Sequence, residues 1–221
     1  MSKILISLSN DKRMFDVKKK HRKKIETLIN GLQRDAAEAM LNNQELPEFD
    51  LCSITVPGTN LFCQGNKGLP RSIMPQLKGF PIPDTTAASM PKDKNGKVDV
   101  SQAFLDMLAE QSIKTKRYKV DPSTLKATQN QLVGAKIAMR VGQMENNPNH
   151  KKFKMPYFIS KDGYILDGHH GWASVLAYCL INKTTKKINV IEVDLKIKKL
   201  VKLANDFTRE IGIAQKPAAA N

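Results

Sequence analysis

Apolar residues recur three and four positions apart over five stretches of the chain, which is the spacing of amphipathic helices. The stretches are residues 17–42, 100–111, 131–144, 169–180 and 196–211. Their apolar positions are Ile25, Leu28, Ile29, Leu32, Ala36 and Met40; Phe104, Leu105, Leu108 and Ala109; Val133, Ile137, Val141 and Met144; Trp172, Val175, Leu176, Cys179 and Leu180; and Ile197, Leu200, Ala204, Phe207 and Ile211. The pattern predicts five helices that each bury one face. Asp99 or Ser101 is placed to cap the second.

Short β-prone runs lie between the predicted helices. They occupy residues 3–8, 53–56, 116–120 and 187–195. Two further runs, 157–159 and 164–166, flank Lys161-Asp162-Gly163, which is typical of a β-hairpin. Helices and strands mixed in this way favour an α+β fold with a small mixed sheet and flanking helices.

The region from residue 46 to residue 100 differs from the rest, because it holds seven of the eleven prolines. Proline removes a backbone donor and fixes φ, so long helices and central strands are disfavoured there. Residues 68–77 are rich in apolar side chains, and we expect an ordered, extended segment on the core; a substrate-facing loop is the alternative. Residues 92–97 read as a turn, and residues 125–130 as a polar connector.

Three segments follow from these patterns. Residues 1–45 form a basic helical arm, residues 46–115 a Pro/Gly-rich segment with a connecting helix, and residues 116–221 a compact core with a basic final helix.

The net charge of +15 favours polyanionic partners such as DNA or nucleotides. The candidate nucleic-acid contacts are Lys18, Lys19, Lys20, Arg22, Lys23 and Lys24 in the arm, and Lys196, Lys198, Lys199 and Lys202 in the final helix. A solvated helix end is the alternative for the arm. The oligomeric state is left open.

Other partner classes are disfavoured by the sequence. No apolar run approaches the ~18 residues of a membrane span, and residues 1–8 are too short for a signal peptide. The expected location is therefore the cytoplasm, or the host cytoplasm for a phage protein. The three cysteines contain no CxxC pair, which disfavours a cysteine zinc site.

The sharpest chemical signal is the run 164–173, where a β-prone stretch passes through Asp167-Gly168 into a helix that opens with His169-His170. A helix N-terminus presents free N–H groups and a positive dipole end, so it binds phosphates. Asp167 is a candidate Mg²⁺ ligand, and the two imidazoles are candidate proton carriers. The alternative is a turn followed by two surface histidines that cap the helix.

The run 156–172, together with 125–129 and the helix between them, resembles the ParB/sulfiredoxin superfamily. It looks closest to the branch with the signature DGHHRW, which contains ParB-like nuclease domains, often from phages and mobile elements, and archaeal free-serine kinase. The resemblance covers residues 116–195. It implies a small α+β fold that binds ATP, ADP or CTP with Mg²⁺.

The resemblance also assigns residues. It implies that Asp167, His169 and His170 are catalytic, that Asp167 holds the metal, and that His169 is the best candidate for the general base. The phosphate-binding set that it implies is Lys126, Thr128, Gln129, Gly168, His169, His170 and Gly171.

Two departures from the family pattern narrow the chemistry. Position 171 is Gly where the family has a phosphate-binding Arg, so a lysine must replace that contact or nucleotide affinity falls. Position 169 is not Cys, which excludes sulfiredoxin chemistry.

The favoured function is a nucleotide-dependent phosphotransferase (kinase-like) or nucleotide hydrolase acting on or near nucleic acid. A metal-dependent nuclease and a non-catalytic DNA-binding protein remain as alternatives.

Overall fold

The computed structural model describes residues 23–35, 37–42, 44, 48–50, 55–56, 59–60, 68–77 and 82–213. These residues divide into two compact units. The first combines the described residues up to Phe49 with Val133–Phe153 and His170–Lys186. The second combines those from Asp50 to Leu132 with Lys154–His169 and the residues from Lys187 onward. Among the described residues, no helix is long and apolar enough to cross a membrane.

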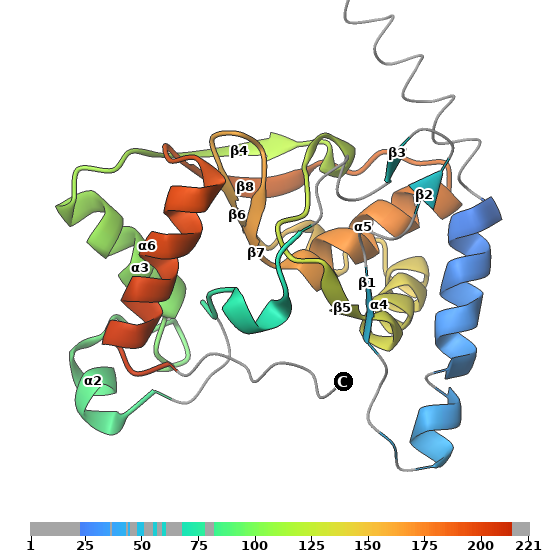
Figure 1. Ribbon diagram of the computed structural model, residues 1–221, viewed down its shortest axis with the longest axis horizontal. Helices are drawn as coiled ribbons and strands as arrows, with labels where there is room; N and C mark the ends of the chain where they lie inside the picture. The colour runs from blue at the N-terminus through green and yellow to red at the C-terminus, as the bar shows by residue number, and fades with distance from the viewer. Residues whose placement is uncertain are drawn as a thin grey trace, which may run out of the picture. The chain divides into compact units, whose positions relative to one another are not determined.

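A four-stranded mixed sheet forms the centre of the second unit (Figure 1). Its strands are β4 (Thr115–Val120), β8 (Ile188–Val193), β6 (Tyr157–Ser160) and β7 (Ile165–Asp167), in that spatial order. β6 pairs parallel with β8, and the other two pairings are antiparallel. The α+β class with a small mixed sheet is therefore confirmed, as is the hairpin that joins β6 and β7.

Two helices, α3 (Val100–Glu110) and α6 (Ile197–Glu210), share a hydrophobic core with this sheet. The ring of Phe104 lies 5.7 Å from that of Phe158 and 5.3 Å from that of Phe207, centroid to centroid. Asp99 caps α3, because its Oδ1 accepts from the backbone N–H of Gln102 at 3.0 Å. Both helices begin and end close to the residues expected, since their apolar stripes point to one core.

The described part of the Pro-rich region is ordered against this core. It contains the 3₁₀ helix η2 (Arg71–Ile73) and the short helix α2 (Asp84–Ser89). Met74 and Leu77 are buried, which confirms the expected packing of residues 68–77. A bridge between Lys92 and Val98 closes the expected turn.

A short antiparallel pair lies earlier in the same unit. Its strands are β2 (Thr55–Val56) and β3 (Thr59–Asn60). β2 confirms the end of the strand expected over residues 53–56, while residues 53 and 54 lie outside the described residues.

Helices dominate the first unit. Residues 23–35 and 37–41 are helical, and they are joined in this unit by α4 (Gly134–Asn146), most of α5 (His169–Ile181) and the 3₁₀ helix η4 (Lys151–Phe153). Leu32 packs against Gly134, where an added Cβ would lie 2.2 Å from Leu32 Cδ2.

The described helix near the N-terminus follows the expected stripe only in part. Ile25, Ile29 and Leu32 are buried as expected, but Met40 is 66% exposed and its neighbour Ala39 is buried. The side chain of Ala36 lies outside the described residues, as do the strand expected at 3–8, the cationic residues from Lys18 to Arg22, and the tail 215–221.

Two further expectations need correction. The helix expected from Gln131 begins at Gly134, because Gln131–Val133 form a strand, β5, that pairs with β1 (Glu48–Asp50). α5 is buried on almost all sides, whereas its apolar stripe predicted a single buried face. Small buried residues such as Ala173 and Ala177 occupy the faces outside the stripe, so the sides of this helix differ little in polarity.

Candidate phosphate-binding corner

A tight corner joins β7 to α5 in the second unit, and we define it as Asp167, Gly168 and His169. Gly168 has a φ of +99°, a conformation that side chains other than glycine resist. A Cβ at this position would lie 2.6 Å from Cδ1 of Tyr157, which sits on the neighbouring strand β6. Glycine is thus required at residue 168 for two independent reasons, and the strand can turn directly into the helix.

His169 is buried at the corner, with 4% of its surface exposed. Its Nε2 accepts two hydrogen bonds, from the backbone N–H groups of Thr128 at 3.1 Å and Gln129 at 3.0 Å. Burial lowers the pKa of this imidazole to about 3, so it is neutral and carries its proton on Nδ1. The surface-histidine alternative is wrong for His169. These contacts give it a structural role and do not favour it as a general base.

His170 has a comparable contact in the first unit. Its Nε2 accepts from the backbone N–H of Val133 at 2.9 Å, and its carbonyl accepts from Ser174 Oγ at 2.6 Å. Gly171 is buried in the same helical turn. Both adjacent histidines therefore use Nε2 to hold backbone N–H groups that lie between residues 128 and 133.

The segment 125–130, expected to be a polar connector, is mostly buried and runs beside the hairpin. Lys126 N–H donates to the carbonyl of Gly163, and Ile165 N–H donates to the carbonyl of Lys126, both at 2.9 Å. Leu69 N–H donates to the carbonyl of Thr128 at 2.6 Å. Backbone pairing on both sides explains the burial, because such groups must be satisfied once water is excluded.

The structure therefore brings Thr128 and Gln129 to the corner as expected, and it places Lys126 differently. Nζ of Lys126 lies 4.5 Å from the centroid of the Tyr164 ring, a cation–π contact. The side-chain amide of Gln129 donates to the carbonyl of Gln131. Gln129 thus orders the loop in which it lies.

Buried polar oxygens lie in the corner and in the segment whose backbone contacts His169. Thr128 is 3% exposed, and its hydroxyl has no hydrogen-bond partner among the described residues. The same holds for Oδ1 of Asn130, and Oδ2 of Asp167 is also buried. A buried hydroxyl without a partner costs about 1–3 kcal/mol, so its retention calls for an acceptor. One sign in the sequence that Asn130 belongs to this set is its place directly after Gln129.

The corner offers a metal ion one carboxylate. In the described part of the chain, no group of three or more His, Cys, Asp or Glu side chains is placed to hold a metal ion. Mg²⁺ does not need such a group, because it keeps several waters and binds through one or two carboxylates together with phosphate oxygens. Asp167 is the carboxylate that such a mode would use.

The expected nucleic-acid contacts on α6 are exposed. Lys196, Lys198, Lys199 and Lys202 are all on the surface, and Lys202 pairs with Asp206 at 2.9 Å. This pairing lowers the pKa of the Asp206 carboxyl. Lys23 and Lys24 are exposed at the start of the described helix, while Lys18, Lys19, Lys20 and Arg22 lie outside the described residues.

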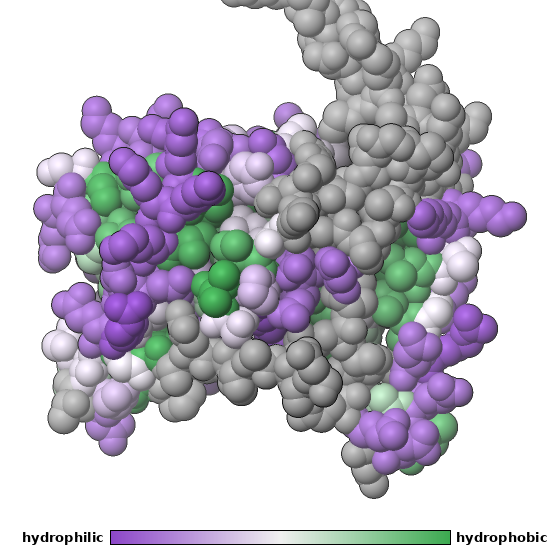
Figure 2. Space-filling model, in the orientation of Figure 1, coloured by the Kyte–Doolittle hydropathy of each residue, from purple (hydrophilic) through white to green (hydrophobic). Residues whose placement is uncertain are grey.

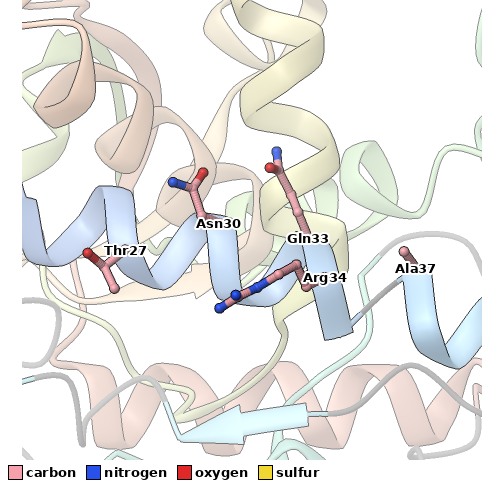
Figure 3. Close-up of a pocket in the computed structure, with 5 residues that line it drawn as sticks. All are labelled: Thr27, Asn30, Gln33, Arg34 and Ala37. Atoms are coloured by element: carbon pink, nitrogen blue, oxygen red, sulfur yellow. The ribbon is translucent and has the colours of Figure 1, made fainter.

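A separate open groove lies in the first unit, on the helix of residues 23–41 (Figure 3). It is lined by Thr27, Asn30, Gln33, Arg34 and Ala37. These residues carry one cation and no carboxylate or imidazole, so the groove offers little for catalysis.

No protein-family model, curated protein or solved structure matches the chain.

Proposed function

We propose that the chain is a nucleotide-binding protein of the ParB/sulfiredoxin type, which holds nucleotide phosphates at the corner of Asp167, Gly168 and His169. The observation that carries the proposal is the buried Thr128 hydroxyl, which has no hydrogen-bond partner among the described residues, in a residue whose backbone N–H donates to His169 Nε2. A phosphate oxygen would supply that acceptor.

The helix that follows the corner supports the same ligand. α5 has thirteen residues, so its dipole is well developed, and the N–H groups of its first turn have no partner within the helix. Gly168 lets the strand turn directly into the helix, so the N–H groups of the first helical turn follow the corner at once. The small mixed sheet and flanking helices are compatible with the ParB/sulfiredoxin-like architecture that the sequence motif implies.

Phosphoryl transfer or nucleotide hydrolysis on or near nucleic acid is the reaction class that this resemblance implies. Positioning and charge neutralisation supply most of the rate acceleration in such reactions. Asp167 would hold Mg²⁺ against the phosphates. The general base must lie elsewhere than His169, whose lone pair is engaged by two backbone N–H groups.

Binding without turnover is the second candidate. It is favoured by one observation: both imidazoles of the motif accept backbone hydrogen bonds through Nε2. The retained motif would then serve a nucleotide-binding or DNA-binding protein that performs no chemistry.

The variant Thr128→Val tests whether the Thr128 hydroxyl binds phosphate or has only a structural role. Valine keeps the shape and removes the O–H, so without ligand the variant should be as stable as the wild type or more stable. In a thermal-shift assay with ATP, ADP and CTP, with and without Mg²⁺, the wild type should be stabilised by about 2.7 kcal/mol at a hundred times Kd. The variant should lose most of that shift.

Asp167→Asn is the companion variant. It should keep the metal-independent part of the shift and lose the part that Mg²⁺ adds. If no nucleotide stabilises the wild type with any divalent cation, or if Thr128→Val retains the full shift, phosphate binding at the corner is refuted. Release of inorganic phosphate by the wild type then distinguishes turnover from binding.

A further inference from the structure

Strand β4 stands out because almost all of its side chains are exposed, although it belongs to the central sheet. Thr115–Lys119 are exposed on both faces, and only Val120 is partly buried. β4 lies at the edge of the sheet, with β8 as its partner there. Exposure on both faces is unusual for a strand whose neighbour, β8, is largely buried. The core therefore places few demands on the side chains of β4.

Three of the five exposed residues of β4 are cationic, and a fourth cation, Lys114, directly precedes the strand. We define the β4 basic strip as Lys114, Lys116, Arg117 and Lys119. A strand of six residues is about 20 Å long, and its successive side chains point to opposite faces of the sheet. Lys114 and Lys116 therefore lie on the face of Tyr118, and Arg117 and Lys119 lie on the other face, with both pairs along the open edge of the sheet. Figure 2 shows mostly hydrophilic side chains along the edge of the molecule where Figure 1 places β4.

Tyr118 lies within the strip and is 41% exposed. Its hydroxyl donates to Oε2 of Glu192 at 2.6 Å, which fixes the position of the ring on the sheet surface. Three acidic residues of the second unit adjoin the strip: Glu192, which lies opposite Lys116; Asp194, which pairs with Lys161 at 3.1 Å; and Asp121, which follows the strand. Cations remain in excess, and an aromatic ring is interleaved with them.

We infer that the β4 basic strip binds a single-stranded nucleic acid, with its cations on the phosphates and the Tyr118 ring stacked on a base. Proteins that bind single strands combine a positive track for the backbone with exposed aromatic rings. The strip extends toward α6, because Asp194 N–H donates to the carbonyl of Lys114 and the helix begins three residues later. This interface is separate from the phosphate-binding corner and does not depend on it.

Edge protection is the competing explanation, since lysines on edge strands prevent sheets from pairing with other chains. That role needs charge and does not need a stacked ring. It predicts that neutral variants self-associate while their affinity for nucleic acid stays unchanged. Size-exclusion chromatography of each variant, beside the binding assay, separates the two explanations.

The experiment measures anisotropy of a labelled 20-nucleotide oligo-dT with the full chain at several salt concentrations. Arg117→Gln/Lys119→Gln should weaken binding and reduce the slope of log K against log salt by about 1.4, at ~0.7 per lost phosphate contact. The matched control is Lys94→Gln/Lys97→Gln, which removes the same charge from the exposed 92–97 turn of the same unit. The control should leave the slope nearly unchanged.

Tyr118 provides the second arm. Tyr118→Ala should weaken binding roughly 5- to 150-fold, as expected for loss of one stacked base, whereas Tyr118→Phe should bind like the wild type. The inference is overturned if the control pair weakens binding as much as the strip pair. It is also overturned if Ala and Phe at residue 118 behave alike, or if the strip prefers a duplex of the same length.

Discussion

A buried histidine at a helix N-terminus suggests a catalytic role, but the contacts of His169 indicate a structural role. Two backbone N–H groups donate to one nitrogen, and the residue is buried, with 4% of its surface exposed. Protonation would place a charge in the core and break both hydrogen bonds. At the scale of the residue, His169 therefore fixes the position of the loop that contains Thr128.

Replacing the imidazole tests this role. His169→Ala leaves two buried N–H groups without an acceptor, at about 1–3 kcal/mol each, so the free energy of unfolding should fall by roughly 2–6 kcal/mol. His169→Gln should recover part of the loss, because its Oε1 reaches approximately where Nε2 stood. Urea denaturation measures both. Equal losses for Ala and Gln would show that ring packing, rather than the hydrogen bonds, sets the effect.

The low pKa of His169 predicts a dependence of stability on pH. The unfolded imidazole titrates near pH 6.5 and the folded one near 3, so between these values the unfolded state binds the extra proton. Stability should therefore fall as the pH falls below about 6.5, by up to about 1.4 kcal/mol per pH unit.

His169→Gln serves as the reference for this pH dependence, because His150 and the carboxylates titrate in both proteins. Urea midpoints at pH 7.5, 6.5, 5.5 and 4.5 give the comparison. The stability gap between wild type and variant should narrow as the pH falls. A gap that stays constant from pH 7.5 to 4.5 would show that His169 titrates normally in the folded protein.

At the scale of elements, the passage from β7 to α5 depends on a single glycine. Gly168 combines a positive φ with direct packing of Tyr157 against its Cα, so both conformation and space exclude a side chain. Gly163, in the turn of the same hairpin, has a φ of +81° but open space around it. Gly142, inside α4, has open space and an ordinary helical backbone.

These three glycines form a graded series of Gly→Ala variants. Gly142→Ala should stabilise the protein by up to about 1 kcal/mol, because alanine favours the helix. Gly163→Ala should cost about 1–2 kcal/mol through backbone strain alone. Gly168→Ala should cost more than either, since strain and steric overlap combine. Thermal unfolding gives the order, and a Gly168→Ala variant as stable as Gly163→Ala would remove the steric argument.

The amphipathic patterns predicted α3 and α6 and the hairpin predicted β6–β7, because each depends on local periodicity or turn chemistry. They failed at residues 125–133, where backbone pairing decides the structure, with residues 69, 163 and 165 for the first part and with β1 for Gln131–Val133. No local pattern reports such pairing. The motif likewise located the corner but not the use of its histidines, because hydrogen bonds to residues 128 and 133 are made across about forty residues of sequence.

At the scale of the whole molecule, the compact units cut across the three segments read from the sequence. α3 lies before residue 116 and yet contributes Phe104 and Leu108 to the core of the second unit, both fully buried. Residues 69 and 129 are also bridged. The resemblance at residues 116–195 therefore marks the region of the motif, and the folded unit extends beyond it.

The dependence of the core on α3 gives the last prediction. Phe104→Ala in the full chain should cost about 3–5 kcal/mol, because it removes a fully buried ring that contacts Phe158 and Phe207. Met139→Ala is the matched control, since that apolar side chain is 53% exposed and its loss should cost less than about 0.5 kcal/mol.

A fragment of residues 116–221 lacks α3 altogether. It should show no cooperative thermal transition, because the inner faces of β6, β8 and α6 would be open to water. Cooperative unfolding of that fragment, together with a Phe104→Ala variant as stable as Met139→Ala, would restore the boundary at residue 116.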